Sequence, residues 1–125
     1  MIVVDSCGWL EYLADGPLAQ DYAPFLAEEG NILTPAVVFY EVVKKVWRER
    51  GYEKALVVAA HMQKTRVVPL DADLGLAAAG VSLRWGLPMA DAIVYATAVS
   101  HWCRVVTSDR HFDGLPEVVF IPATG

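Results

Sequence analysis

The chain has 125 residues, of which 55% are hydrophobic and 20% charged, so it has enough apolar side chains for the core of one domain. The formal net charge is −5. The high hydrophobic fraction and the low charged fraction exclude a disordered chain, and two cysteines are too few for a disulfide framework or a zinc ribbon. No apolar run reaches the roughly 18–20 residues that span a bilayer, and no cationic leader opens the chain. We therefore expect one cytoplasmic domain over residues 1–125, with no membrane partner.

Short β-branched runs alternate along the chain with longer helical patterns. Strands are expected at residues 2–5, 32–33, 66–68, 104–106 and 118–121, and helices at 8–14, 18–29, 35–50, 52–64, 72–85 and 89–102. Ser6 is expected to cap the first helix, and Thr34-Pro35 is typical of a helix start, with Thr as the cap and Pro as the first helical residue. The alternation indicates parallel βαβ units. The predicted fold class is α/β, a single three-layer α/β/α domain with a short, mostly parallel central sheet.

Two acidic residues follow predicted strands. Asp5 comes directly after the first strand, and Asp109 lies two residues beyond the apolar run of the fourth. The carboxyl ends of parallel strands meet at one edge of a sheet, where open α/β folds bind ligands. Each residue alone is also compatible with an ordinary loop or cap, because Asp is common after strands.

Two further acids lie in apolar helical segments. The other seven residues of 36–43 around Glu41 are apolar, and Asp91 is the one formally charged residue between positions 85 and 103. Helices this apolar are expected to be buried around most of their circumference. A lone carboxylate taken out of water costs several kcal/mol unless a cation neutralises it, so each of these acids predicts a facing cation.

The cation could belong to the protein or be a bound metal. Lys44 or Lys45 could pair with Glu41, and Arg84 or Arg104 with Asp91. Four carboxylates at one pole would nevertheless share few cations. A divalent ion resolves their repulsion, and oxygen ligands favour Mg²⁺ or Mn²⁺.

Such a carboxylate cluster suits the hydrolysis of a phosphodiester bond. The metal lowers the pKa of a bound water and stabilises the leaving oxygen, and either Glu41 or Asp109 could take the proton from that water. His61, His101 and His111 have neither the paired spacing of a zinc site nor a Ser-His-Asp order. We expect these histidines at the surface or at the edge of the core.

Basic residues are concentrated in one segment. Residues 1–43 contain seven acids and no Lys or Arg, whereas residues 44–66 contain seven of the ten basic residues. This layout fits a polyanion held by a metal site with a cationic flank, or simply a solvated helix face. The candidate phosphate-binding residues are Lys44, Lys45, Arg48 and Arg50, since such contacts need no base readout.

Four motifs occur in an order that resembles PIN-domain ribonucleases, and most of all the VapC-type toxins of prokaryotic toxin–antitoxin pairs. They are Met1-Ile2-Val3-Val4-Asp5-Ser6 followed by Trp9-Leu10, Thr34-Pro35 leading to Glu41, Leu87-Pro88-Met89-Ala90-Asp91-Ala92, and Val105-Val106-Thr107-Ser108-Asp109-Arg110-His111-Phe112. Any one of these motifs is weakly specific, but the ordered set covers nearly the whole chain.

The resemblance implies a metal-dependent endoribonuclease. In that family's pattern the catalytic acids are Asp5, Glu41, Asp91 and Asp109, of which Asp5, Asp91 and Asp109 hold Mg²⁺ or Mn²⁺, with Ser6 and Thr107 as hydroxyl support and Asp113 as a fifth acid. It also implies an RNA substrate, a homodimer, and a small antitoxin that blocks the active site. Cys7 departs from the pattern, because the family more often has a small polar residue there.

Other functions fit parts of the sequence. A housekeeping PIN nuclease that processes RNA would carry the same residues, and an inactive PIN-like module that binds RNA or protein is a further alternative. A phospho-receiver domain lacks its paired acids after the first strand and its late Lys, since no Lys follows Lys64. A haloacid-dehalogenase-type phosphatase would need Asp-x-Asp where this chain has Asp5-Ser6-Cys7.

Overall fold

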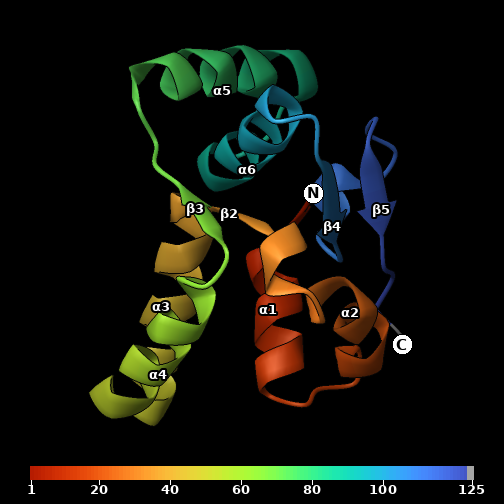
Figure 1. Cartoon of the computed structure of the whole chain (residues 1–125). Helices are drawn as coiled ribbons and strands as arrows, with labels where there is room; N and C mark the ends of the chain where they lie inside the picture. Colours follow the sequence, from red (N-terminus) through yellow and green to blue (C-terminus); the bar gives the residue numbers. More distant parts are fainter. Residues whose placement is uncertain (124–125) are drawn as a thin grey trace.

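The computed structural model describes residues 1–123, in which short parallel strands alternate with helices (Figure 1). The strands are β1 (Ile2–Val4), β2 (Leu33–Pro35), β3 (Arg66–Val68), β4 (Arg104–Thr107) and β5 (Val118–Phe120). The helices are α1 (Ser6–Leu13), α2 (Ala19–Leu26), α3 (Ala36–Arg50), α4 (Tyr52–Met62), α5 (Ala72–Trp85) and α6 (Met89–Ser100), with 3₁₀ turns η1 (Glu29–Asn31) and η2 (Arg110–Phe112). Each predicted strand and helix is present, with ends that shift by a few residues.

The strands form two parallel ladders that meet at β1. β4 pairs with β1 on one side and with β5 on the other, and Val3 lies opposite Val105. β2 pairs with β3, and a bridge between Ile2 and Ile32 joins this pair to β1. The strands thus follow the order β3-β2-β1-β4-β5. From β1 the chain adds β2 and β3 on one side of the sheet and then β4 and β5 on the other. The switch point therefore lies between β1 and β4, and open α/β sheets bind ligands at such a point.

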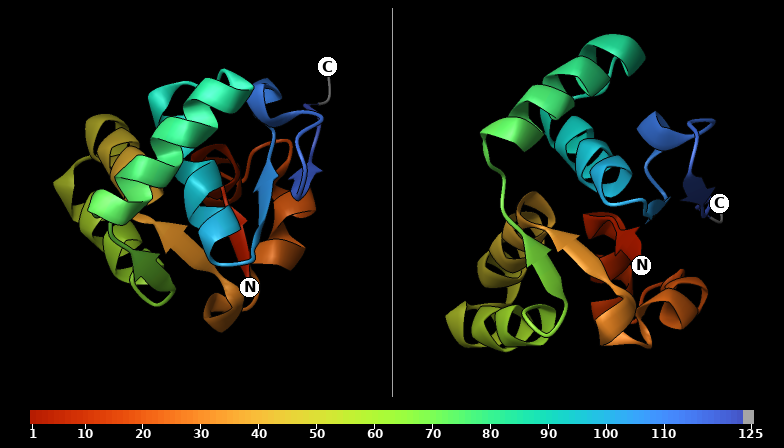
Figure 2. Two further views of the ribbon diagram at one scale, coloured as in Figure 1. Left: turned by 90° about the horizontal axis from the view of Figure 1, so that it is seen from above. Right: turned by 45° about the horizontal axis from the view of Figure 1, so that its top comes forward.

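Helices cover both faces of the strands, as the views in Figures 1 and 2 agree. α5 and α6 lie on one side and α1 and α2 on the other, while α3 and α4 form a hairpin beside α1. Helix α6 is buried over the whole stretch from Ala92 to Ala98, so it packs as a central helix. These layers confirm the predicted α/β fold. Within residues 1–123, no helix combines the length and the apolar character needed to cross a bilayer.

Two helix starts differ from the prediction. Asp5, and not Ser6, is the N-cap of α1, because the Asp5 side chain accepts a 2.8 Å hydrogen bond from the Ser6 N–H. Helix α3 begins at Ala36, and Thr34 and Pro35 belong to β2. The Thr34 hydroxyl is hydrogen-bonded instead to the Thr65 hydroxyl, at 2.6 Å. The longer β2 is therefore tied to the segment before β3.

Candidate active site at the ends of β1 and β4

The parallel pairing of β1 and β4 brings Asp5 and Asp109 to the same edge of the sheet. Thr107, the last residue of β4, is fully buried and lies between them. Its Oγ1 donates a 2.8 Å hydrogen bond to Asp5 Oδ2 and accepts a 3.0 Å bond from the Asp109 N–H. Thr107, which the family resemblance gives as a supporting hydroxyl, therefore contacts the side chain of one acid and the backbone of the other.

Asp5 is a buried carboxyl group with no basic partner among residues 1–123. Only 4% of the residue is exposed, and its oxygens accept hydrogen bonds from the Ser6 N–H and the Thr107 hydroxyl. Burial raises the pKa of Asp5, and the charge of Asp109 adds to that effect, while the two hydrogen bonds oppose it. A positive charge placed at this carboxylate would therefore be stabilising.

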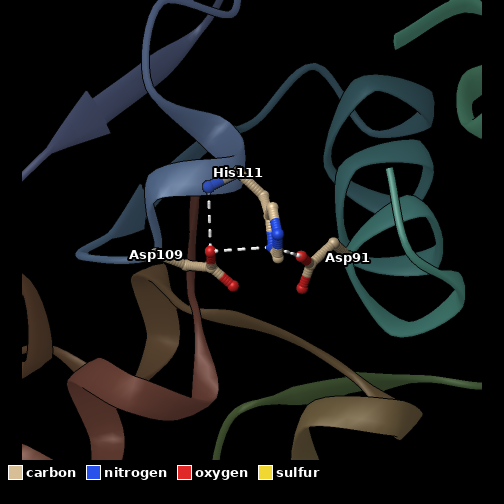
Figure 3. A group of neighbouring side chains, drawn as sticks. All are labelled: Asp91, Asp109 and His111. Carbon is tan, nitrogen blue, oxygen red and sulfur yellow. Dashed lines mark hydrogen bonds and ion pairs between the residues drawn. The ribbon is translucent and has the colours of Figure 1, made fainter. Parts of the chain in front are cut away.

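Asp91 and Asp109 come together around the imidazole of His111 (Figure 3). His111 Nδ1 lies 2.8 Å from Asp91 Oδ2 and 3.1 Å from Asp109 Oδ1, and the His111 N–H donates a 2.9 Å bond to the same Asp109 oxygen. Asp91 stands in the first turn of α6, whereas Asp109 caps η2. Burial and the charges of Asp109 and Asp5 raise the pKa of Asp91 to about 6.

Glu41 faces the same cluster from α3. Burial and then the charge of Asp5 raise its pKa, and the charge of Asp109 acts in the same direction, while a hydrogen bond from the Ser6 side chain opposes them. Each of the four predicted acids thus either has its pKa raised by the charge of another acid of the set or raises the pKa of another. The sequence-predicted acids Asp5, Glu41, Asp91 and Asp109 form one electrostatic cluster.

The basic side chains considered as partners for the two helical acids are engaged elsewhere. Lys45 pairs with Glu49 at 3.7 Å, and the Lys44 ammonium lies over the Tyr40 ring. Arg84 lies over the Trp85 ring, and Arg104 pairs with Glu117 at 3.6 Å. Among the residues that the structure describes, no Lys or Arg forms an ion pair with an acid of the cluster.

The donor chemistry of the cluster fits a hard divalent cation. Carboxylate oxygens are the ligands that Mg²⁺ and Mn²⁺ prefer, and Asp91, Asp109 and His111 each offer one ligand atom within 4.8 Å of the others. Asp5 is the buried acid next to this group. A bound cation would relieve the burial and repulsion that raise the pKa values of Asp5, Glu41 and Asp91.

Cys7 links the end of β1 to the loop after β4. Its thiol donates a long hydrogen bond of 3.8 Å to Asp5 Oδ2, and its sulfur accepts the Ser108 N–H at 3.5 Å. The Ser108 hydroxyl is bonded in turn to the Tyr22 hydroxyl of α2 at 2.5 Å. Burial raises the pKa of the Cys7 thiol, which keeps it in the neutral form. Cys7 therefore bridges the two strand ends as an uncharged group.

The close approach of α2 behind the site depends on Gly8. A Cβ atom at this position would lie 2.3 Å from the Tyr22 ring and 2.8 Å from the Val4 side chain. No larger residue fits there without moving α2. Gly8 thus allows Tyr22 to reach the loop that carries Asp109.

The sequence also proposed Asp113 as a fifth acid. The residue is exposed at the end of η2, and the group of possible metal ligands does not include it. Asp113 is also absent from the charges that raise the pKa values of Asp5, Glu41 and Asp91. The structure does not bring Asp113 into the cluster.

Three of the four predicted phosphate-binding residues border the acidic cluster. Lys44, Lys45 and Arg48 line a surface depression of about 260 Å³ whose wall also includes Ser6 and Glu41. Arg50 lines a different hollow, between α1 and the α3–α4 hairpin. A polyanion in the first depression would meet Glu41 and the basic side chains of α3.

Sequence reasoning missed His111 as a member of the site. It was expected at the surface or core edge, and its side chain is indeed 59% exposed, but the ring nitrogen Nδ1 faces two acids. The available signal was its position two residues after Asp109, in a turn that carries the fully buried Phe112. That short spacing folds the His111 backbone onto the Asp109 carboxylate.

Solved structures that share this fold include proteins described as parts of toxin–antitoxin complexes and as a toxin. A toxin–antitoxin complex from Klebsiella pneumoniae matches with a TM-score of 0.82 at 18% identity, over 95% of this chain and 96% of the other. VapC20 of Mycobacterium tuberculosis, described as a sarcin-ricin loop cleaving toxin, matches with 0.77 at 21%, over 98% and 100%. FitAcB of Neisseria gonorrhoeae matches with 0.76 at 22%, over 98% of each chain. At these identities the similarity establishes the fold.

The family is established from sequence. A search among curated proteins finds no match to this chain. The family model described as the PIN domain matches residues 2–118, a span that contains Asp5, Glu41, Asp91 and Asp109. The resemblance predicted from the four ordered motifs is confirmed, and the chain belongs to the PIN domain family.

Proposed function

We propose that this protein is a divalent-metal-dependent endoribonuclease and the toxin of a toxin–antitoxin pair. The observation that carries the proposal is the cluster of four acids, Asp5, Glu41, Asp91 and Asp109. Each of these acids has a raised pKa or raises the pKa of another acid in the cluster. No Lys or Arg of the described residues neutralises them. Membership of the PIN family and the toxin folds of its structural neighbours support it.

Asp5, Asp91 and Asp109 are the proposed metal ligands. When bound, Mg²⁺ or Mn²⁺ would lower the pKa of a nearby water and stabilise negative charge on the scissile phosphate. Thr107 holds Asp5 and the Asp109 backbone in register, so that two of these carboxylates keep a fixed separation.

Glu41 is the proposed proton acceptor. Its pKa is raised by burial and by the charge of Asp5, and this brings the carboxylate closer to the basicity that a general base needs near pH 7. Glu41 also lines the depression that contains Lys44, Lys45 and Arg48. RNA phosphates held by those side chains would run past Glu41 toward the metal ligands.

The proposed partners follow from the same assignment. The substrate is an RNA with an exposed single-stranded loop, because unpaired bases can leave the stack and open the backbone to the site. The structural neighbours include toxin–antitoxin complexes, which supports the proposal that an antitoxin covers the acidic cluster. We also propose that the protein forms a homodimer and is located in the cytoplasm. A PIN nuclease of RNA maturation would use the same chemistry without an antitoxin.

The proposal is tested by cleavage of a pool of RNA hairpins with randomised loops. Purified wild-type protein is incubated with 5′-labelled RNA in Mg²⁺, in Mn²⁺ and in EDTA, beside Asp91→Asn. Asp73→Asn is the matched control, because this exposed acid of α5 lies outside the group of possible metal ligands. We expect cuts with wild type and Asp73→Asn in either metal, and none with Asp91→Asn or in EDTA.

Three outcomes would contradict the proposal. Cleavage in EDTA would remove the metal from the mechanism, and cleavage by Asp91→Asn at the wild-type rate would remove this acid from the site. A protein that binds the RNA pool but cuts no member of it in either metal would instead be a PIN-like binding module.

A further inference from the structure

The geometry points to His111 as a nitrogen ligand of the metal, so that the site holds three carboxylates and one imidazole. This inference rests on the proposed function, because it concerns the same metal. It goes beyond that function by predicting which metal the protein selects.

The distances at His111 match those between neighbouring ligands of one octahedral ion. Metal–ligand bonds of roughly 2.0–2.1 Å place adjacent ligand atoms about 2.8–3.0 Å apart. Nδ1 lies 2.8 Å from Asp91 Oδ2 and 3.1 Å from Asp109 Oδ1. An ion bound by both carboxylates would have the imidazole nitrogen at ligand distance.

The backbone that carries the imidazole is held on both sides of the His111 Cα atom. The His111 N–H is bonded to Asp109 Oδ1, and the next residue, Phe112, is fully buried against the core, near the Tyr95 ring. Figure 3 shows the ring between the two carboxylates, with Asp91 coming from α6 and Asp109 from the loop after β4. An ion that enters between these acids therefore meets Nδ1.

A nitrogen ligand changes the metal preference. Carboxylates suit Mg²⁺ and Mn²⁺ alike, whereas an imidazole nitrogen binds transition metals such as Mn²⁺ better than it binds Mg²⁺, which prefers oxygen ligands. We therefore expect the wild-type protein to prefer Mn²⁺ over Mg²⁺ by a larger factor than a site of carboxylates alone. Loss of the His111 ring should lower the Mn²⁺ affinity about tenfold, with less than a threefold change for Mg²⁺.

The direct test is pulsed EPR of Mn²⁺ bound to tag-free protein. A nitrogen that ligates Mn²⁺ gives a ¹⁴N hyperfine coupling that oxygen ligands cannot give. We compare wild type with His111→Ala and with His101→Ala. His101 caps the far end of α6, about 15 Å along the helix from Asp91, and its Nδ1 lies 2.8 Å from the Thr97 carbonyl oxygen.

The expected result is a ¹⁴N coupling in wild type and His101→Ala that is absent in His111→Ala. Circular dichroism checks that both variants fold, which the 59% exposure of the His111 side chain favours. Bound Mn²⁺ without a ¹⁴N coupling in wild type, or a coupling that persists in His111→Ala, overturns the role of His111 and leaves the carboxylate site standing. Wild-type protein that binds no Mn²⁺ overturns the proposed metal site and this inference together.

Discussion

Thr107 is hydrogen-bonded to Asp5 across 102 positions of sequence, with 2.8 Å between Thr107 Oγ1 and Asp5 Oδ2. The same hydroxyl accepts the N–H of Asp109 at 3.0 Å. One buried side chain on β4 thus contacts two acids that follow different strands. The pairing of β1 with β4 makes this contact possible, because it sets Val4 opposite Val106, directly before these residues.

Thr107→Val should weaken both the fold and the metal site. The substitution keeps the shape of the side chain but removes the hydroxyl donor to Asp5 Oδ2 and the acceptor of the Asp109 N–H, which costs about 1–3 kcal/mol of unfolding free energy. Affinity for Mn²⁺ should fall about tenfold, as for other groups that orient metal ligands. Urea unfolding and calorimetry measure the two effects.

Thr97→Val is the control for this prediction. Thr97 is also fully buried, but its hydroxyl bonds to the Ile93 carbonyl within α6. This variant should change stability and leave the Mn²⁺ affinity as in wild type. Equal Mn²⁺ affinities for Thr107→Val and Thr97→Val would show that Thr107 does not position the acids.

Asp91→Asn should stabilise the metal-free protein. The carboxylate is ionised at pH 7.5 and repelled by Asp109 and Asp5, whereas a neutral amide is not. We expect a gain of about 1 kcal/mol in the free energy of unfolding, since solvent screens part of the repulsion. Urea unfolding in EDTA measures it. With Mn²⁺ present, wild type should instead be more stable than Asp91→Asn, because the metal stabilises only a protein that binds it.

The stability of the metal-free wild type should rise as the pH falls from 8 to 5. The pKa of Asp91 is about 6 in the folded protein, against 3.8 for the ordinary group, so between these values the folded state binds more protons than the unfolded one. Asp5 and Glu41 have raised pKa values and contribute with the same sign. Unfolding in EDTA at several pH values tests this, and a stability that falls between pH 8 and 5 would contradict it.

The sequence predicted the acids better than it predicted their contacts. Asp5 and Asp109 could be placed at one edge because parallel strands align their carboxyl ends, which follows from the alternation of strands and helices alone. Glu41 and Asp91 stood out because a charge is costly in an apolar helix. These arguments need only the fold class and the hydrophobic pattern.

The remaining details depend on tertiary distances. Nothing near Thr34 in the sequence indicates that its hydroxyl meets Thr65, so the segment looked like a helix cap when it is the end of β2. The contact of His111 with Asp91 joins residues twenty positions apart through the packing of η2 against α6. The alternative pairing of Glu41 with Lys44 or Lys45 is not observed, because Lys44 lies over the Tyr40 ring and Lys45 pairs with Glu49.

Arg48 and Arg50 offer a matched pair for RNA binding. Both are exposed on α3, but Arg48 lines the depression beside Glu41 and Arg50 does not. In an Asp91→Asn background with EDTA, Arg48→Ala should weaken binding of an RNA hairpin and reduce the salt slope by about 0.7, the value for one contact to a single strand. Arg50→Ala should leave the slope unchanged. Equal losses for the two variants would place the RNA elsewhere.

The most direct measurement of the central claim is a calorimetric titration of Mn²⁺ into metal-free protein at pH 7.5. We compare wild type with Asp5→Asn, Asp91→Asn and the control Asp73→Asn. Wild type and the control should bind with the same affinity, and the two site variants should lose at least tenfold, because each lacks a carboxylate of the cluster. Unchanged binding by both site variants, or no binding by wild type, would contradict a metal site at these acids.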